Sequence, residues 1–377
     1  MLTTKPKRKS WIGRFAALVI SFLLLPALSQ AGSVVYSIID LGVLPGGTSS
    51  AAAGISSNGL VTGSGDSAAA VSQPFLWTSG SGLSAVDAGS LFAFGAGINA
   101  SATVVGYGFS SDFSTYSAFI IDGSTITSIP TLPGGSNNAA TAINDSGTVV
   151  GYSDDASGAI IGFSYASGTL TSLGTLPGGT TSQANAINAS GTIVGQADGS
   201  DGLLHAVVAS GGNWVDLGVL AGYQSSFASA ISDNGFIAGT LNDGFGGTMA
   251  FLWQSGSMSA LGALLPGGDS SAYGVNSAGV VVGSADGTAF LYDDTGMHDL
   301  NALLSPTSSA WLLTEADAIN NSGQIAGTGY YDGQQHAFLL DPVSLPEPAT
   351  LPLLCGALLL LAAGELRHFQ FRKAVKR

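Results

Sequence analysis

The chain has 377 residues, and its 10 Lys and Arg and 24 Asp and Glu give a formal net charge of −14. All the basic residues lie in the first fourteen or the last eleven positions, so residues 32–345 contain neither Lys nor Arg. A region without fixed positive charge cannot neutralise phosphates, which practically excludes nucleic-acid binding. The apolar fraction of 45% argues against disorder, and the single cysteine excludes an intrachain disulfide.

The N-terminus has the parts of a secretory signal peptide. Basic residues precede an apolar run from Phe15 to Leu28, and the small residues that follow suit cleavage between Ala31 and Gly32. The alternative is an uncleaved anchor helix, but the run is shorter than the roughly 20 residues that span a bilayer. We therefore predict that residues 1–31 are a signal peptide.

One sequence pattern recurs through residues 32–343. An example is 143–151, which reads Ile-Asn-Asp-Ser-Gly-Thr-Val-Val-Gly. The last glycine of the pattern recurs at steps of 43, 45, 44, 44, 44 and 44 residues. Its seven positions are Gly63, Gly106, Gly151, Gly195, Gly239, Gly283 and Gly327. Such regular spacing indicates a repeat architecture.

Each copy divides into four short apolar segments separated by turn residues. In the fourth copy we expect strands at 184–187, 192–194, 205–208 and 214–217, with a tight hairpin at 188–191. Nowhere in the repeats is there a sustained helical period, so helices should be few. Four strands in about 44 residues is the size of a β-propeller blade.

The two ends of the repeat region predict a closed ring. The first segment, 34–42, matches the fourth segment of a copy, whereas the last copy ends on a third segment at 336–340. We therefore expect an all-β, seven-bladed propeller whose first strand completes the last blade. The alternative is a right-handed parallel β-helix with two rungs per repeat, which predicts similarity at half the period. We find no such similarity.

The repeats resemble the extracellular HAF repeat family. The resemblance rests on 187–195, on the Leu-Gly-Thr-Leu-Pro-Gly-Gly stretch at 173–179 and on His336-Ala337-Phe338. Only the last copy keeps the whole His-Ala-Phe segment, while its Phe persists in six of the seven copies. We interpret the Phe as packing between blades and the His as replaceable. The resemblance implies an exported repeat protein and supplies no catalytic residues.

The C-terminus, residues 344–377, has a second sorting pattern. Pro346-Glu347-Pro348 precedes an apolar stretch from Ala349 to Gly364 and a basic tail from Arg367 to Arg377. These parts resemble the PEP-CTERM sorting signal of Gram-negative bacteria. The resemblance implies a short transmembrane helix in the inner membrane, recognition by an exosortase-type transpeptidase, and delivery to the cell surface or matrix. A plain tail anchor is the alternative.

Little in the repeats points to catalysis. Glu315 is the only Glu between residues 32 and 345, and a glycosidase needs two carboxylates about 5–10 Å apart. A sialidase-like site would need arginines, which are absent there. A nucleophilic triad needs a positioned histidine, and His205 and His336 occupy one repeat position three blades apart. We therefore predict that the protein is not an enzyme. A cleft joining Glu315 to an Asp would favour the alternative, an enzyme that acts on extracellular polysaccharide.

Two kinds of ligand are considered for the propeller. Acidic loops follow the second strand of several copies and could bind Ca²⁺ weakly, although solvated turn residues are the alternative. The candidate ligands are Asp154, Asp155, Asp198, Asp201 and Asp286. Aromatic residues such as Trp77, Trp214, Trp253, Tyr107, Tyr152, Tyr330 and Tyr331 could bind neutral polysaccharide, unless they pack between blades. We predict an exported surface or matrix protein that binds or spaces other molecules and requires no cofactor.

Overall fold

The computed structural model describes residues 34–343, except residues 69, 70, 91, 211, 307 and 309. The predicted signal peptide with its Ala31–Gly32 cleavage site lies outside these described residues. So does the predicted sorting segment with Pro346, Glu347 and Pro348, together with its apolar helix, and these assignments stay predictions. Between residues 34 and 343, the structure contains no helix of sufficient length and hydropathy to cross a membrane.

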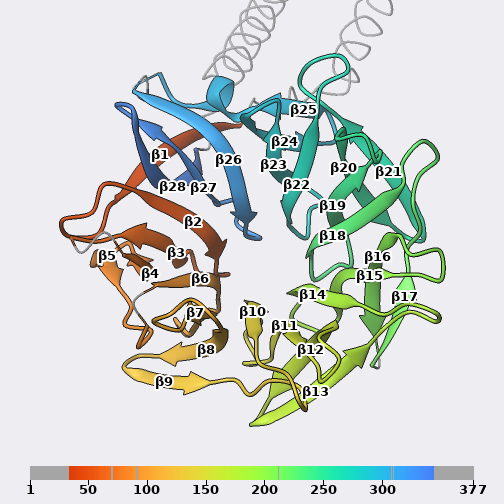
Figure 1. Cartoon of the computed structure of the whole chain (residues 1–377). Coiled ribbons are helices and arrows are strands. Elements are labelled where there is room, and N and C mark those ends of the chain that lie inside the picture. Colours follow the sequence, from red (N-terminus) through yellow and green to blue (C-terminus); the bar gives the residue numbers. More distant parts are fainter. Residues whose placement is uncertain are drawn as a thin grey trace, which may run out of the picture. The chain divides into compact units, whose positions relative to one another are not determined.

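Residues Val35–Val343 form one unit of seven four-stranded sheets arranged in a ring (Figure 1). The neighbouring strands of the sheets pair antiparallel, as in β14 and β15 of the fourth copy. The unit is thus a seven-bladed β-propeller, as predicted, and the parallel β-helix is excluded. The only helical element of the described residues is a single 3₁₀ turn, η1 (Leu300–Leu303).

The blades are numbered here in chain order. Blade 1 contains β2 (Ser50–Ile55), β3 (Val61–Asp66), β4 (Ser72–Thr78) and β5 (Gly82–Ala85). Blade 2 contains β6 (Phe92–Ile98), β7 (Val104–Phe109), β8 (Tyr116–Asp122) and β9 (Thr125–Ser128). Blade 3 contains β10 (Asn138–Ile143), β11 (Val149–Asp154), β12 (Ile160–Ala166) and β13 (Thr169–Gly174). Blade 4 contains β14 (Ser182–Ile187), β15 (Ile193–Asp198), β16 (Leu204–Ser210) and β17 (Asn213–Asp216).

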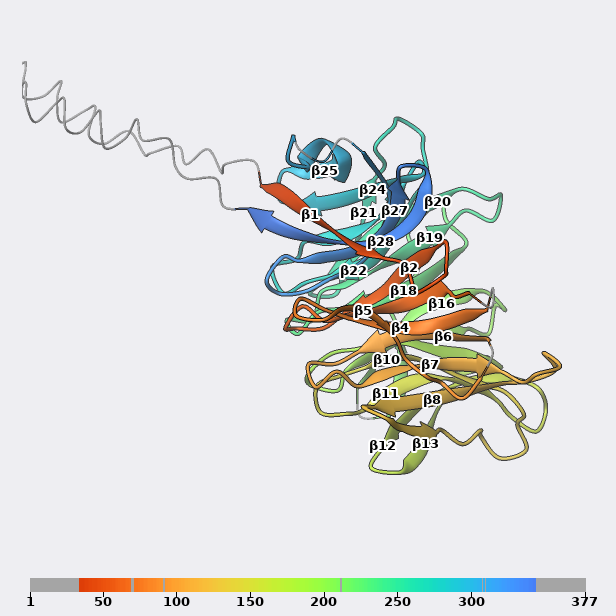
Figure 2. The same cartoon turned by 90° about the vertical axis from the view of Figure 1, so that its left-hand side faces the viewer.

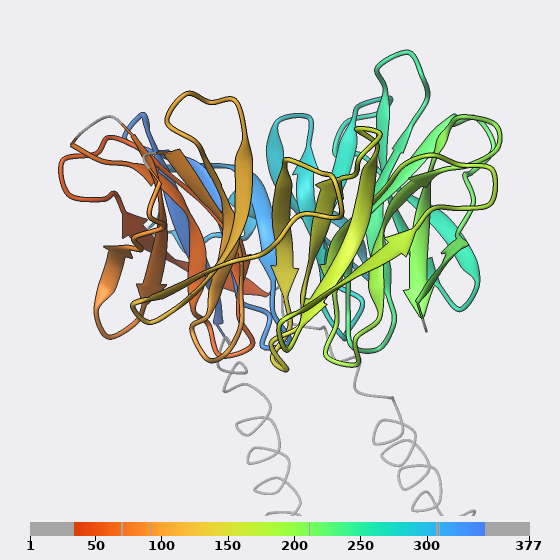
Figure 3. The same ribbon diagram turned by 60° about the horizontal axis from the view of Figure 1, so that its bottom comes forward.

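The other three blades follow the same order. Blade 5 contains β18 (Ser225–Ile231), β19 (Ile237–Asn242), β20 (Thr248–Gln254) and β21 (Ser257–Gly262). Blade 6 contains β22 (Ser270–Val275), β23 (Val281–Ala285), β24 (Thr288–Asp293) and β25 (Gly296–Asp299). Blade 7 contains β26 (Trp311–Ile319), β27 (Ile325–Tyr331), β28 (Gln334–Val343) and the N-terminal strand β1 (Val35–Gly42). The first strand of each of blades 1 to 7 lies nearest the ring axis, and loops project at both faces of the ring (Figures 1 and 3).

The N-terminal strand closes the ring. β1 pairs antiparallel with β28 from Val35 opposite Val343 to Gly42 opposite Ala337. Figure 2 shows the two strands side by side, although they come from opposite ends of the described chain. The prediction that the first segment completes the last blade is therefore confirmed. Closure therefore gives blade 7 the same number of strands as the other six blades.

The hydrophobic core lies between blades rather than at the axis. One cluster joins Phe75 and Val61 of blade 1 to Ala326 and Leu339 of blade 7, and similar clusters join other neighbouring blades. The repeated Phe is buried in each of the six blades that carry it, with an exposed fraction of 4% or less. Its predicted packing role is therefore confirmed.

The repeated glycine is required by a close approach between the first two strands of every blade. A Cβ atom added to Gly195 would lie 1.9 Å from the carbonyl oxygen of Gln183. The equivalent oxygen lies 1.9–2.3 Å from the added Cβ at the other six glycines. A β-bulge follows at the same place in every first strand, for example between Ala184 and Ala186. The glycine therefore serves the packing of the first strand and needs no positive φ.

Candidate functional site

Seven hairpins, each of which joins the first two strands of a blade, lie around the axis at one face of the propeller. They line an axial pocket of about 180 Å³. The first hairpin residue is Asn or Ser and is buried in every blade, with an exposed fraction of 3–6%. These residues are Ser56, Asn99, Asn144, Asn188, Ser232, Asn276 and Asn320. We call them the hairpin ring.

The asparagines of the hairpin ring join each blade to the next. The side-chain oxygen of Asn144 accepts a hydrogen bond from the N–H of Thr148 at 2.9 Å, which closes its own hairpin. Its side-chain nitrogen donates to the carbonyl of Asn188 in the next blade at 3.1 Å. Asn188 donates in turn to Ser232, and Asn320 of blade 7 donates to Ser56 of blade 1 at 3.2 Å.

Serine replaces asparagine in blades 1 and 5, and a second asparagine compensates for the missing amide. Two residues beyond Ser56, the side chain of Asn58 donates to the carbonyl of Ala100 at 3.0 Å. Asn234 follows Ser232 in the same way and donates to the carbonyl of Ser277 at 2.7 Å. Every blade therefore sends one side-chain amide to the next, and the series returns from blade 7 to blade 1.

Five of the seven second hairpin positions line the axial pocket, and three of these five accept hydrogen bonds from the preceding blade. Asp145, Asp233 and Asn321, in blades 3, 5 and 7, each accept a backbone N–H from the preceding blade, at 2.8–2.9 Å. Across the axis, Ser57 donates to Asp145 at 3.1 Å and Asn321 donates to Asp233 at 3.3 Å. The three acceptor side chains are thus already engaged with protein donors.

The bulge residues of the first strands in blades 3 and 4 form hydrogen bonds with the next blade. Thr141 donates to the carbonyl of Ala184 at 2.8 Å, and Asn185 donates to the carbonyl of Ala228 at 2.8 Å. Each bond therefore reaches the next blade, as the bonds of the hairpin ring do. The seven bulge residues are Ala53, Ala96, Thr141, Asn185, Ser229, Tyr273 and Asp317. Sequence analysis missed this set, although the fixed repeat position of its polar members is a signal that could have found it.

Asp317 of β26 and Tyr273 of β22 are two ionisable groups whose pKa is shifted, and Glu315 of β26 is a charged neighbour of both. Burial, and then the negative charge of Glu315, raise the pKa of Asp317 to about 7, against a hydrogen bond from Thr328 at 3.0 Å. Burial and the charges of Glu315 and Asp317 also raise the pKa of Tyr273. The structure therefore brings the single repeat-region Glu close to an Asp.

The predicted calcium ligands are occupied by hydrogen-bond donors. Asp154, Asp198 and Asp286 each accept backbone N–H groups from the Leu-Pro-Gly-Gly loop that leads into the first strand of the same blade. Asp155 caps its own turn by accepting from Ser157 at 2.8 Å, and Asp201 pairs with His205 at 3.3 Å. Among the described residues, no three His, Cys, Asp or Glu side chains are grouped to hold a metal ion.

These bonds set the charge state of the loop carboxylates. Partial burial opposes ionisation of Asp198, but hydrogen bonds from Thr181 and Thr180 outweigh it and lower its pKa. The same balance holds for Asp66 of blade 1, where Thr48 and Ser49 donate and the pKa falls to about 2. In each loop the carboxylate therefore stabilises a Pro-Gly turn, such as the one at Gly178, whose φ is +83°.

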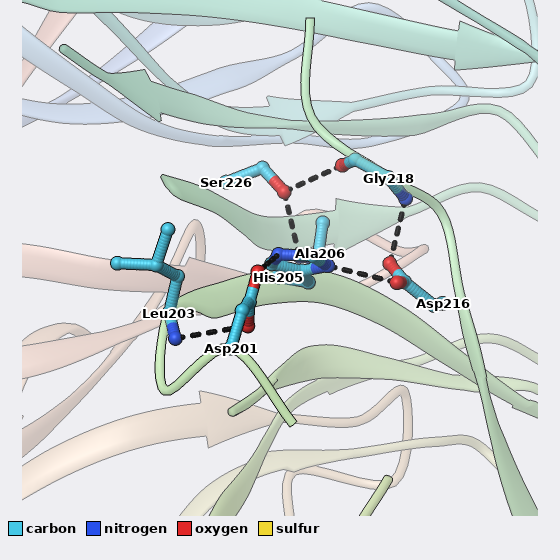
Figure 4. Close-up of polar contacts among 7 residues, drawn as sticks. All are labelled: Asp201, Leu203, His205, Ala206, Asp216, Gly218 and Ser226. Carbon is cyan, nitrogen blue, oxygen red and sulfur yellow. Dashed lines mark hydrogen bonds and ion pairs between the residues drawn. The ribbon is translucent and has the colours of Figure 1, made fainter. Parts of the chain in front are cut away.

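The two histidines of the His-Ala-Phe position have carboxylate partners on the outer strand of their own blades. His205 lies 2.8 Å from Asp216 through Nδ1 and 3.3 Å from Asp201 through Nε2 (Figure 4). Asp216 also accepts the N–H of Gly218 at 2.7 Å. His336 lies 2.8 Å from Asp40 in the same manner. The His205 and His336 sites lie three blades apart, as predicted, so they do not form a shared site.

The aromatic residues divide into two groups. Trp77 and Trp214 are buried in clusters between blades, and Trp253 packs partly against a third cluster. For these three the packing interpretation is confirmed. Tyr330 and Tyr331, in contrast, are 44% and 36% exposed. Tyr107 and Tyr152 are half-buried.

The sequence matches no family model and no curated protein. Several solved structures are similar to it at low sequence identity. A gluconolactonase from Xanthomonas campestris is 10% identical, with a TM-score of 0.42 over 84% of this chain and 93% of its own. AofleA from Arthrobotrys oligospora is 14% identical, with a TM-score of 0.40 over 72% and 92%. Aleuria aurantia lectin is 12% identical, with a TM-score of 0.35 over 84% and 97%. None of the three is similar enough to transfer a function.

Proposed function

We propose that the protein is an exported, non-enzymatic propeller of the cell surface or extracellular matrix, which binds neutral polysaccharide. The observation that carries the proposal is that the repeated polar side chains bond to other parts of the propeller. Those of the hairpin ring and of the Leu-Pro-Gly-Gly loops form hydrogen bonds that hold the fold together. Because these polar side chains stabilise the fold in every blade, they favour a binding or spacing role over a catalytic one.

The charge of the propeller supports a neutral rather than an acidic ligand. Residues 32–345 contain no Lys or Arg, so an acidic polysaccharide would meet carboxylates without a compensating cation. Hydroxyl, amide and carboxylate groups beside aromatic rings are the groups that hold neutral sugars. A neutral polysaccharide is not repelled by the carboxylates. It can form hydrogen bonds with the polar groups and pack on the aromatic rings.

The sorting part of the proposal rests on the two ends of the sequence. We propose export through the signal peptide, transient anchoring in the inner membrane, and processing near Pro346-Glu347-Pro348 by an exosortase-type transpeptidase. The pairing of Val35 with Val343 is compatible with this, because the chain enters and leaves the propeller at neighbouring positions. Mass spectrometry of the surface fraction tests it. The mature chain should begin at Gly32 and lack the basic tail, and replacement of 346–348 by alanine should preserve the tail.

Affinity electrophoresis of the full-length chain tests the binding role. Dextran, mannan and a neutral galactan serve as neutral probes in the gel, and polygalacturonate serves as the acidic match. We expect at least one neutral polysaccharide to retard the protein and polygalacturonate to leave it unretarded. Free migration in all three neutral gels would contradict the proposal.

One observation favours a second candidate function, an enzyme that acts on extracellular polysaccharide. Asp317 has a pKa of about 7 beside Glu315, and a carboxyl group that is protonated near neutral pH can act as a general acid. Release of reducing ends from the same polysaccharides tests this function. Glu315→Gln and Asp317→Asn should each abolish the release if the pair is catalytic. Release from both variants at the rate of the parent chain would reject a catalytic role.

A further inference from the structure

A cavity of about 500 Å³ lies where blades 7, 1 and 2 meet. Its lining includes Ala51 and Ala53 of blade 1, Phe94 and Tyr107 of blade 2, and Gln335 of blade 7. The volume falls within the range of roughly 300–1,000 Å³ that is typical of small-molecule sites. Gln335 lies in β28, the strand that pairs with β1, so the cavity includes a residue of the blade that the N-terminal strand completes.

The cavity is present because these blades depart from the repeat. Ala53 and Ala96 occupy the bulge position, where blades 4 and 7 carry Asn185 and Asp317. Ala51 likewise occupies the position of Gln183 in blade 4, two residues before the bulge. Small residues at these positions leave open the space that longer side chains take elsewhere in the ring.

One wall of the cavity is aromatic. The rings of Phe94 and Tyr107 are stacked, with centroids 5.4 Å apart and planes 30° apart. No other blade has aromatic residues at both of these paired positions; blade 4, for example, has Gln183 opposite Gln196. Phe109 and Tyr116 pack behind Tyr107 at 5.9 Å, which holds the wall rigid.

The other walls carry uncharged hydrogen-bonding groups. The hydroxyl of Ser64 accepts from the N–H of Gly95 at 3.2 Å, which leaves its own hydrogen available to a ligand. Ser72 donates to the carbonyl of Ala93 at 3.3 Å, which leaves its oxygen available as an acceptor. The side-chain amide of Gln335 is exposed and has no hydrogen-bond partner among the described residues. The only carboxylate in the lining, Asp66, is engaged by Thr48 and Ser49.

We propose that this cavity is the saccharide site of the protein and holds one neutral pyranose unit of a polysaccharide. The apolar face of the sugar ring packs on Phe94, and its hydroxyl groups exchange hydrogen bonds with Ser64, Ser72 and Gln335. A hexuronic acid is disfavoured because Asp66 lies in the wall and no cation does. The inference rests on the proposed function, since it places neutral-polysaccharide binding at one blade junction.

Calorimetric titration of the full-length chain with maltohexaose, cellohexaose and mannohexaose tests the site, with a galacturonate hexamer as the charged match. Phe94→Ala should weaken binding of the accepted neutral oligosaccharide at least about tenfold, because it removes the stacking wall. Ala53→Asn should weaken binding to a similar degree, because it fills the space with a residue that blade 4 already accommodates at this position. Phe227→Ala, at the equivalent position of blade 5, is the matched control and should bind within about twofold of the parent chain.

The outcomes separate the site from the proposed function. Binding by the parent chain that survives in both Phe94→Ala and Ala53→Asn would overturn the site and leave the proposed function standing. Absence of binding to all three neutral oligosaccharides in the parent chain would overturn both. Tight binding of the galacturonate hexamer would overturn the assignment to a neutral sugar. Ala53→Asn keeps the test decisive if Phe94→Ala fails to fold.

Discussion

The Nδ1 atom of His336 lies 2.8 Å from Oδ1 of Asp40, a residue 296 positions earlier in the chain. The same contact joins His205 to Asp216 within blade 4, also at 2.8 Å. In both blades the His at the first place of the His-Ala-Phe segment thus contacts an Asp of the outer strand. In blade 7 the contact has an additional effect, because it fastens β1 to the last blade.

A comparison of Asp40→Ala with Asp216→Ala measures this additional effect. Each variant loses a histidine contact and one backbone N–H contact, from Gly42 at 2.8 Å or from Gly218 at 2.7 Å. We expect Asp216→Ala to lower the free energy of unfolding by about 1–2 kcal/mol and Asp40→Ala by about 1 kcal/mol more. Urea titration followed by fluorescence measures both. Equal losses would contradict a special role of the Asp40 contact in closure.

The repeated glycine should tolerate no side chain. Gly195→Ala places a Cβ atom 1.9 Å from the Gln183 oxygen, so one of the first two strands of blade 4 must shift. We expect a loss of about 2–4 kcal/mol in the free energy of unfolding. The matched control is Gly80→Ala, where no atom lies within 4 Å and φ is not positive, and it should change stability by less than about 0.5 kcal/mol. Similar melting temperatures for the two variants would refute the close-approach explanation.

The carboxylates of the Leu-Pro-Gly-Gly loops should make the propeller sensitive to acid. Folding lowers the pKa of Asp66 to about 2, below its ordinary value near 3.8, so its contribution to stability is complete above pH about 4. That contribution is lost as the pH falls through about 2. We expect the urea midpoint to fall between pH about 5 and pH about 2, and to fall less in Asp66→Asn, which has no charge to lose. An unchanged pH dependence in Asp66→Asn would contradict this prediction.

Asp317 should have the opposite effect on the pH dependence of stability, because it destabilises the fold as the pH rises. Its pKa is raised to about 7, so the folded state favours the protonated form and loses stability as the pH rises from about 4 to about 7. Asp317→Asn retains an acceptor for Thr328 and removes the charge. We expect the variant to exceed the parent by more than about 1 kcal/mol at pH about 8 and to equal it at pH about 4. A variant less stable than the parent at pH about 8 would show that Asp317 is ionised without penalty.

The sequence predicted the propeller because the repeat carries its own periodicity. The spacing of Gly63 to Gly327 gave the blade number, and the outer-strand pattern at 34–42 gave the closure. For the fourth copy, the expected strands overlap β14 to β17, although the second was expected to end at residue 194 and extends to Asp198. The extension arises because Asp198 is still paired with Leu204 and also accepts from the loop before β14.

The sites were harder to predict because they depend on contacts between blades. The repeat position of Asn185 can be read from the sequence, but its hydrogen bond to Ala228 of the next blade depends on the bulge that the fold introduces. The acidic loop residues suggested calcium, whereas the structure assigns Asp154 and Asp198 to the capping of neighbouring turns. The cavity beside Phe94 depends on the small side chains of Ala51, Ala53 and Ala96. An alanine in a single copy gives no indication that it leaves space for a ligand.

Closure of the ring by β1 is the relationship on which both the fold and the proposed saccharide site depend, since the cavity draws on blades 7, 1 and 2. Its most direct test is the urea unfolding of a chain that lacks residues 34–42, with and without a synthetic peptide of that sequence. We predict that the deletion lowers the unfolding midpoint and that the peptide, added in excess, restores it. A shortened chain that unfolds at the midpoint of the parent, with no response to the peptide, would contradict the closure.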